Sequence, residues 1–175
     1  MHFGSIFLMR EFRRRYCSDA LLPGARLLDV GSRAVETRWR WLGMPASYRP
    51  VFKGVGEYVG VDLGAGPGVD VELTDPYRYP FESDSFDIVI SGQTLEHSQH
   101  PWRVVPEMAR VLKPGGLLCV IAPWSWQVHR YPIDCWRILA DGMEVLLRDA
   151  GLTVLECRMK RSDTIGIARK EAPGA

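Results

Sequence analysis

Seven short segments rich in apolar residues recur along the chain, and helical stretches separate several of them. We expect strands at residues 26–31, 57–63, 69–73, 86–91, 117–123, 153–157 and 164–168. Most of these segments are near-continuous apolar runs, which is typical of strands that are buried on both faces of a parallel sheet. The pattern therefore predicts an α/β fold in which helices cover both faces of a mostly parallel sheet.

Three helices are predicted from the spacing of apolar residues and from the Pro and Gly residues that follow them. They cover about residues 1–20, 102–112 and 141–150. Pro106 is expected in the first turn of the second helix, because proline has no N–H to donate inside a helix. A chain of 175 residues fits one domain. We expect residues 23–175 to form that domain and residues 1–22 to add a helix that closes its site.

Composition and charge limit the kinds of partner. The chain is 46% hydrophobic and 25% charged, as soluble globular proteins are, and it lacks an apolar run of about 18 residues that could span a membrane. We therefore expect a cytoplasmic protein. Charge is uneven, with a net of +6 over residues 1–53 and −8 over residues 54–100. The densest basic cluster, Arg10 to Arg15, is expected to be a solvated helix face, with a phosphate-binding arm for RNA as the alternative.

Cysteine and histidine spacing predicts neither a disulfide framework nor a metal centre. The cysteines form no C-x-x-C pair, and the histidines form no cluster along the chain. These residues are Cys17, Cys119, Cys135 and Cys157, and His2, His97, His100 and His129. We expect buried or incidental thiols and no metal site.

Ligands of parallel α/β sheets bind beyond the carboxyl ends of the strands, so the residues after each strand are the candidates for the site. Gly31 permits a sharp turn after the first strand, and Ser32 follows it. Asp62, at the tip of the second strand, could accept hydrogen bonds from two ribose hydroxyls, or could be a surface carboxylate or a helix cap. Asp75 could accept from an exocyclic amine, or could open a turn before Pro76. The G-x-G-x-x-G of a dinucleotide site is absent, which argues against a dehydrogenase.

The order of the motifs resembles the class I S-adenosylmethionine-dependent methyltransferases, and most of all their small type 11 branch. The resemblance rests on L-L-D-V-G, Y-V-G-V-D, D-x-x-x-x-P-F followed by S-F-D, L-E-H and R-V-L-K-P-G-G, in this order over about residues 24–170. It implies a single Rossmann-like domain, with a seven-stranded, mostly parallel sheet whose last strand is antiparallel and which helices flank. It also implies S-adenosyl-L-methionine as cofactor and methyl transfer as activity.

The resemblance assigns roles to residues that match the family motifs. They are Asp29, Gly31 and Ser32 around the methionine part of the cofactor, Asp62 and Leu63 at the ribose, Asp75 and Pro76 at the adenine, and Ser91 and Gly92 at the amino acid end. Two positions depart from the family pattern. Residues 31–35 hold one glycine where the family usually has three, and Pro76 has no N–H to donate to the adenine ring.

Catalytic residues are expected on the segments after the fourth and fifth strands. Methyl transfer displaces an already activated leaving group, so alignment of the acceptor matters most, and a hydroxyl acceptor also needs a base. His97 and His129 are candidate bases, and Asp134 could orient His129. The alternatives are a structural role for His97 and an ion pair between Asp134 and Arg137 that locks the loop.

The segment over residues 123–137 holds three of the six tryptophans and is expected to roof the site. Its side chains should pack a flat or sugar-like acceptor through Trp124, Trp126, Tyr131, Trp136 and Arg137. We therefore expect a small-molecule methyltransferase, with O-methylation of a sugar, glycan precursor or secondary metabolite. An RNA methyltransferase and a catalytically silent interaction module are the alternatives. The small chain leaves closure of the site to the N-terminal helix and the roof, or to a second subunit of a homodimer.

Overall fold

A computed structural model of the chain describes residues 3–34 and 47–172, and it holds one seven-stranded sheet in the order β3-β2-β1-β4-β5-β7-β6. The strands are β1 (Arg26–Val30), β2 (Glu57–Asp62), β3 (Val71–Glu72), β4 (Phe86–Gly92), β5 (Leu112–Pro123), β6 (Thr153–Lys160) and β7 (Asp163–Arg169). β7 is antiparallel to both neighbours, whereas the remaining neighbours pair in parallel. The predicted α/β fold, with an antiparallel last strand, is confirmed.

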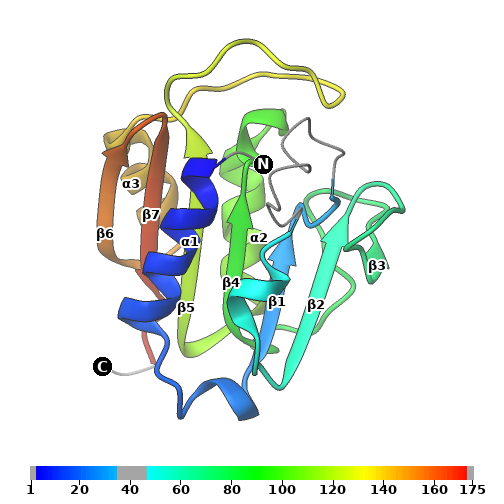
Figure 1. Cartoon of the computed structure of the whole chain (residues 1–175), viewed down its shortest axis with the longest axis vertical. Coiled ribbons are helices and arrows are strands. Elements are labelled where there is room, and N and C mark those ends of the chain that lie inside the picture. Colours follow the sequence, from blue (N-terminus) through cyan, green and yellow to red (C-terminus); the bar gives the residue numbers. More distant parts are fainter. Residues whose placement is uncertain (1–2, 35–46, 173–175) are drawn as a thin grey trace.

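Helices cover both faces of the sheet (Figure 1). α1 (Phe3–Tyr16) lies in front of β5 and β7, and α2 (Pro101–Val111) and α3 (Ala140–Asp149) lie behind the sheet. One apolar cluster fills each of the two interfaces. In α1, Ile6, Met9 and Phe12 recur every three residues and are buried, so one stripe of this helix faces the sheet. Burial of each such side chain stabilises the fold by about 1.5–3 kcal/mol.

Several element bounds differ from the prediction. α1 ends at Tyr16 instead of near residue 20. β3 shrinks to two residues, because it is an edge strand that pairs with β2 over Val71 and Glu72 alone in the described chain. β5 begins at Leu112, so residues 113–116 lie in the strand and not in a loop after α2. Here Leu112 pairs with Phe86 before an irregularity in the register.

The expected first-turn position of Pro106 is wrong. α2 begins at Pro101, where a missing N–H costs nothing, and this start moves Pro106 into the second turn. The hydrogen bond that Pro106 cannot donate would have gone to the carbonyl of Trp102, which is 52% exposed. Trp102 therefore lies on the solvent-exposed side of the helix.

The carboxyl ends of β1, β2, β4 and β5 meet along one edge of the sheet, at the top of Figure 1, and the segment between β5 and α3 crosses above that edge. We call residues 124–139 the roof. The amide of Cys135 donates to the carbonyl of Glu96 at 2.7 Å, and the indole of Trp136 donates to the carbonyl of Ser98 at 2.8 Å. These bonds hold the roof against the 3₁₀ turn at Leu95–His97 that follows β4.

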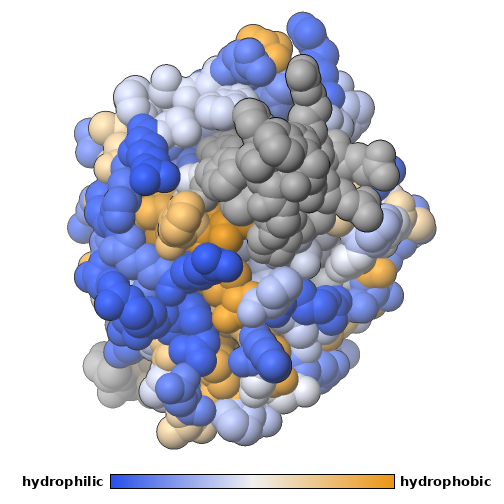
Figure 2. All heavy atoms as spheres, in the orientation of Figure 1, coloured by the Kyte–Doolittle hydropathy of each residue, from blue (hydrophilic) through white to orange (hydrophobic). Residues whose placement is uncertain are grey.

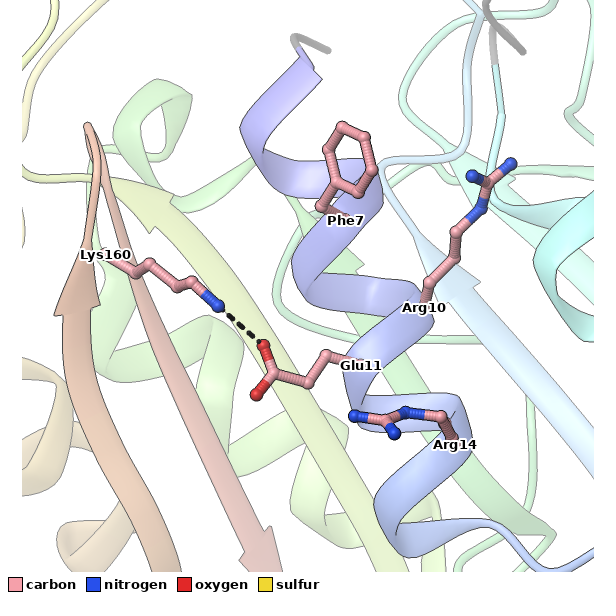
Figure 3. Close-up of a pocket in the computed structure, with 5 residues that line it drawn as sticks. All are labelled: Phe7, Arg10, Glu11, Arg14 and Lys160. Carbon is pink, nitrogen blue, oxygen red and sulfur yellow. Dashed lines mark hydrogen bonds and ion pairs between the residues drawn. The ribbon is translucent and has the colours of Figure 1, made fainter.

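The face that carries α1 is mostly hydrophilic, with an apolar strip along its middle (Figure 2). Arg13 pairs with Asp19 at 2.5 Å and Arg15 pairs with Glu156 at 2.8 Å. The residues around a hollow between α1 and the end of β6 are Phe7, Arg10, Glu11, Arg14 and Lys160 (Figure 3). Two charges of the basic cluster are thus paired locally. Over the described residues, none of the helices is both long and apolar enough to cross a membrane.

Candidate functional site

The turn after β1 forms the first wall of the candidate site. Gly31 has a φ of +80°, and a Cβ there would lie 2.0 Å from Oγ1 of Thr94, so glycine is required at this position. The amides of Gly31 and Ser32 both donate to the carbonyl of Val61, at 2.9 and 3.0 Å. The turn is therefore held between the ends of β2 and β4.

Asp29 is buried beneath this turn, with 2% of its surface exposed. The hydroxyl of Tyr58 donates to its Oδ2 at 2.6 Å. Burial raises the pKa of Asp29 to about 7, although the Tyr58 hydrogen bond and the nearby Arg49 act in the opposite direction. Asp29 thus ties β1 to β2. Tyr58 is a partner that our sequence reasoning missed, and its signal was a polar-tipped side chain inside a buried strand.

Asp62 ends β2, next to the turn after β1. Its Oδ2 accepts the amide of Arg33 at 3.1 Å, and no described residue bonds to its Oδ1. Leu63 follows and is 55% exposed. The guanidinium of Arg33 lies against the next loop, because a Cβ at Gly64 or Gly66 would be 2.9 Å from its Nη1 or 3.2 Å from its Nε. An open carboxylate oxygen therefore lies beside an exposed apolar side chain.

Asp75 opens a turn beyond β3. Its Oδ1 accepts the amide of Tyr77 at 2.8 Å across Pro76, which is the turn-opening geometry of an Asp-Pro pair. Its Oδ2 has no hydrogen-bond partner among residues 3–34 and 47–172, and the residue is exposed. Turn formation therefore leaves one oxygen of Asp75 available to a ligand.

Ser91 and Gly92 are the last two residues of β4 instead of following it. The Ser91 hydroxyl donates to the carbonyl of Val30 at 2.9 Å. A Cβ at Gly92 would lie 2.1 Å from the hydroxyl oxygen of Tyr48, so this buried tyrosine covers the strand end. Ser5 of α1 lies near the hydroxyl of Tyr48. Sequence reasoning did not single out Tyr48, and through it α1 reaches the edge that carries the site.

His97 and His129 meet above the end of β4, although 32 positions separate them in the sequence. Their rings are 4.9 Å apart between centroids, and Tyr131 lies 6.0 and 6.3 Å from them. Nδ1 of His97 is 2.6 Å from the carbonyl of Ile133. Because a carbonyl oxygen only accepts, Nδ1 carries the hydrogen and Nε2 the lone pair. Burial lowers the pKa of His97, so its ring is neutral at pH 7.

Asp134 contacts both of the partners that the sequence suggested. Its oxygens accept from the two Nη atoms of Arg137, at 2.7 and 2.8 Å. Its Oδ2 also accepts the amide of His129 at 2.7 Å and lies 3.4 Å from Nδ1 of that ring. The hydrogen bond from Arg137 holds the pKa of Asp134 well below its usual range. One carboxylate therefore locks the loop and also faces the histidine.

The aromatic side chains of the roof do not gather around one site: two are hydrogen-bonded to other segments and two are exposed to solvent. The indole of Trp124 donates to the carbonyl of Arg161 at 2.8 Å, in the turn between β6 and β7. The indole of Trp136 is engaged in holding the roof down. Trp126 and Tyr131 are 42% and 54% exposed. Among the described residues of the roof that we predicted to pack the acceptor, Tyr131 is the one with a ring contact to the histidines.

Glu96 is a site residue that sequence reasoning missed, although it lies inside the L-E-H motif. It has no exposed surface, and no described residue donates a hydrogen bond to either of its carboxylate oxygens. Burial raises its pKa to about 8. One ligand atom from each of Glu96, His97 and His129 lies within 4.8 Å of the others. The expectation of no metal site rested on spacing along the chain, and the fold brings these three residues together.

Comparisons with known proteins agree with this arrangement. Residues 50–120 match the model of a family described as a methyltransferase domain. A protein of Mycobacterium sp. (strain KMS), described as an uncharacterized methyltransferase, is 36% identical in an alignment of 106 residues that covers 54% of this chain and 38% of that protein. The chain thus spans well under half the length of the curated relatives it matches.

Solved structures of low identity share the fold. A putative methyltransferase from Bacillus halodurans superimposes with a TM-score of 0.68 at 16% identity, over 97% of this chain and 100% of that one. The 1,6-didemethyltoxoflavin-N1-methyltransferase of Burkholderia thailandensis, with bound 1,6-didemethyltoxoflavin and S-adenosylhomocysteine, gives a TM-score of 0.65 at 16% identity, over 97% and 78%. Residues 50–120 are thus similar to a methyltransferase domain, and the described chain shares the fold of solved methyltransferases.

Proposed function

We propose that the chain transfers a methyl group from S-adenosylmethionine to a small-molecule acceptor, by O-methylation of a sugar, glycan precursor or secondary metabolite. The observation that carries the proposal is Asp62, whose Oδ1 has no described partner, at the carboxyl end of β2 beside the Gly31 turn. This is the edge at which parallel α/β sheets bind their ligands.

The described residues fit this cofactor. Asp62 offers a carboxylate oxygen to the ribose hydroxyls, and Leu63 offers an exposed apolar surface to the base. Asp75 offers Oδ2 to the adenine amine. Pro76 donates no N–H, so recognition of the adenine at this turn relies on Asp75 and Leu63. The bound cofactor supplies a methyl group on a positively charged sulfur, which is already activated for displacement.

The roof and the two histidines form the proposed acceptor side. Nε2 of His129 carries a lone pair that can take the proton of an acceptor hydroxyl, and Asp134 faces Nδ1 of the same ring, so we propose His129 as the base. His97 lies beside it, also with a lone pair on Nε2. We propose that α1 closes the other side, because Ser5 lies near the hydroxyl of Tyr48, which covers the end of β4, and the buried face of α1 packs in the same apolar cluster as Tyr48.

Asp62→Ala is expected to weaken binding of S-adenosylmethionine and S-adenosylhomocysteine by about 1.5–3 kcal/mol, because ribose hydroxyls lose a charged partner. That loss corresponds to about 10–150-fold in dissociation constant, measured by calorimetric titration. Asp149→Ala, an exposed acid at the end of α3, is the matched control and should bind as the wild type does. Unchanged affinity in folded Asp62→Ala would refute the ribose assignment. No binding by the wild type would favour the silent interaction module.

His129→Ala is expected to lower turnover about 100-fold or more while the affinity for S-adenosylmethionine stays the same, because a positioned base acts on the acceptor and not on the cofactor. The measurement is release of S-adenosylhomocysteine with a panel of hydroxylated acceptors. Arg130→Ala changes the exposed neighbour and serves as the control. Equal turnover in the two variants would place the base elsewhere.

A further inference from the structure

Two neighbouring histidines, His97 after β4 and His129 in the roof, each keep one ring nitrogen without a hydrogen-bond partner among the described residues. In His97, Nδ1 donates to the carbonyl of Ile133. In His129, Nδ1 lies 3.2 Å from the carbonyl of Gln127 and 3.4 Å from a carboxylate oxygen of Asp134. All these partners only accept, so both rings carry hydrogen on Nδ1 and keep a lone pair on Nε2. Metal-binding histidines are held in this way, with the other nitrogen bonded to a carbonyl or carboxylate.

Glu96 adds a third unused group. Its carboxylate is completely buried, neither oxygen accepts a hydrogen bond within the described chain, and Oε1 lies 3.8 Å from Nε2 of His97. Burial of a carboxylate without partners is costly. Asp134 and Asp163 act on it as further negative charges, and Arg137 acts on it as a positive charge. A bound metal ion would supply the direct partner that the buried carboxylate lacks.

The spacing of the three groups is close to that of a metal centre. Their ligand atoms lie within 4.8 Å of one another, and ligand atoms about 2.1 Å from a tetrahedral ion lie about 3.4 Å apart. Binding of an ion would therefore draw the three ligand atoms closer together. The side chains of His97 and His129 are 14% and 25% exposed, so the cluster is in contact with solvent.

We propose that Glu96, His97 and His129 bind a divalent first-row transition-metal ion and leave its remaining coordination positions open. Two imidazoles and one carboxylate suit Zn²⁺, Fe²⁺, Mn²⁺ or Co²⁺ better than the all-oxygen ligand sets of Mg²⁺ and Ca²⁺. An open position beneath the roof would hold the acceptor oxygen and favour loss of its proton to solvent. In that role the ion replaces the proposed histidine base, because the Nε2 lone pairs of both rings bind it. This second role rests on the proposed methyl transfer, whereas the metal site itself does not.

The test is titration of the full chain, freed of metal with a chelator, with Co²⁺ alone. Visible absorption and calorimetry report the coordination and the affinity. We expect one Co²⁺ per chain and d–d bands of a site with nitrogen and oxygen ligands. Glu96→Gln and His129→Ala should each weaken Co²⁺ binding about 10-fold or more. His100→Ala, which changes a histidine outside the cluster, should leave it unchanged.

Circular dichroism and thermal unfolding establish that each variant folds. If Glu96→Gln does not fold, His129→Ala still tests the proposal, because it changes a partly exposed loop residue and is expected to fold. Absence of Co²⁺ binding, or binding that both variants retain at full affinity, would overturn the proposal. Titration with S-adenosylmethionine without metal separates the two proposals. If the wild-type chain binds the cofactor but not Co²⁺, the metal-site proposal is wrong and the proposed function is unaffected. If it binds Co²⁺ but not the cofactor, the proposed function is wrong and the metal-site proposal is unaffected.

Discussion

Gly31→Ala is expected to destabilise the fold by about 3 kcal/mol or more, measured by urea unfolding. The backbone at Gly31 has a φ of +80°, and the added Cβ would meet Oγ1 and Cγ2 of Thr94 at 2.0 and 2.8 Å. Thr94 does not yield easily, because it is β-branched and its hydroxyl donates to the carbonyl of Val30 at 3.2 Å. The backbone of the turn must therefore move, and binding of S-adenosylmethionine should weaken with it.

Gly115→Ala is the matched control for this substitution. Gly115 has nearly the same φ, +79°, but nothing lies within 4 Å of the Cβ position. Alanine there should cost about 1–2 kcal/mol, which is the backbone strain alone. The difference between the two variants isolates the contact of Gly31 with Thr94. Equal losses of stability would show that this contact is not tight.

Asp29→Asn is expected to stabilise the protein above pH 7 by about 2–4 kcal/mol and to flatten the dependence of stability on pH. The pKa of Asp29 is about 7 in the fold and about 3.9 in an unfolded chain. Between these values the folded state keeps a proton that the unfolded state has lost. The free energy of unfolding therefore falls as pH rises from about 4 to 7, by up to about 1.4 kcal/mol per pH unit.

Asparagine in place of Asp29 keeps an acceptor for the hydroxyl of Tyr58 and cannot ionise. Urea unfolding at pH 5, 6 and 7.5 measures the effect. Asp87→Asn is a control of opposite sign, because the Arg26 amide and Lys113 outweigh burial and lower the pKa of Asp87. Its contribution is present above about pH 4 and is lost as pH falls. Parallel pH profiles for the two variants would contradict the assignment to Asp29.

Local sequence patterns predicted the elements that are buried on both sides. β1, β2 and β4 are interior strands of the sheet and are rich in apolar residues. Because both faces of such strands are buried, apolar residues follow one another without alternating with polar ones, and this pattern is easy to recognise in a sequence. Element ends were harder to predict, because partners elsewhere in the chain decide them. Leu112 extends β5 by pairing with Phe86 on another strand, and the edge strand β3 ends where its pairing with β2 ends.

Candidate site residues divide in the same way. Asp62 could be predicted, because a strand followed by an acid places that acid at the sheet edge whatever its neighbours are. The close approach of Tyr48 to Gly92 could not be predicted from the sequence, because it depends on side-chain packing between distant segments. For Asp134 the sequence offered two alternatives, an ion pair with Arg137 or a contact with His129. Spacing along the chain could not decide between these partners, and in the structure Asp134 contacts both.

The amino-acid sequence alone therefore sufficed for the class of fold and for the order of helices and strands, because apolar periodicity is a local property. It also placed the candidate site residues at the carboxyl ends of the strands, because the residue that ends a strand is likewise local. Tertiary structure decided which side chains share that edge. Glu96 and His97 follow β4, His129 comes from the roof, and only the parallel pairing of β4 with β5 brings them within 4.8 Å. A proximity of that kind arises from the three-dimensional path of the chain, which no spacing between residues along it encodes.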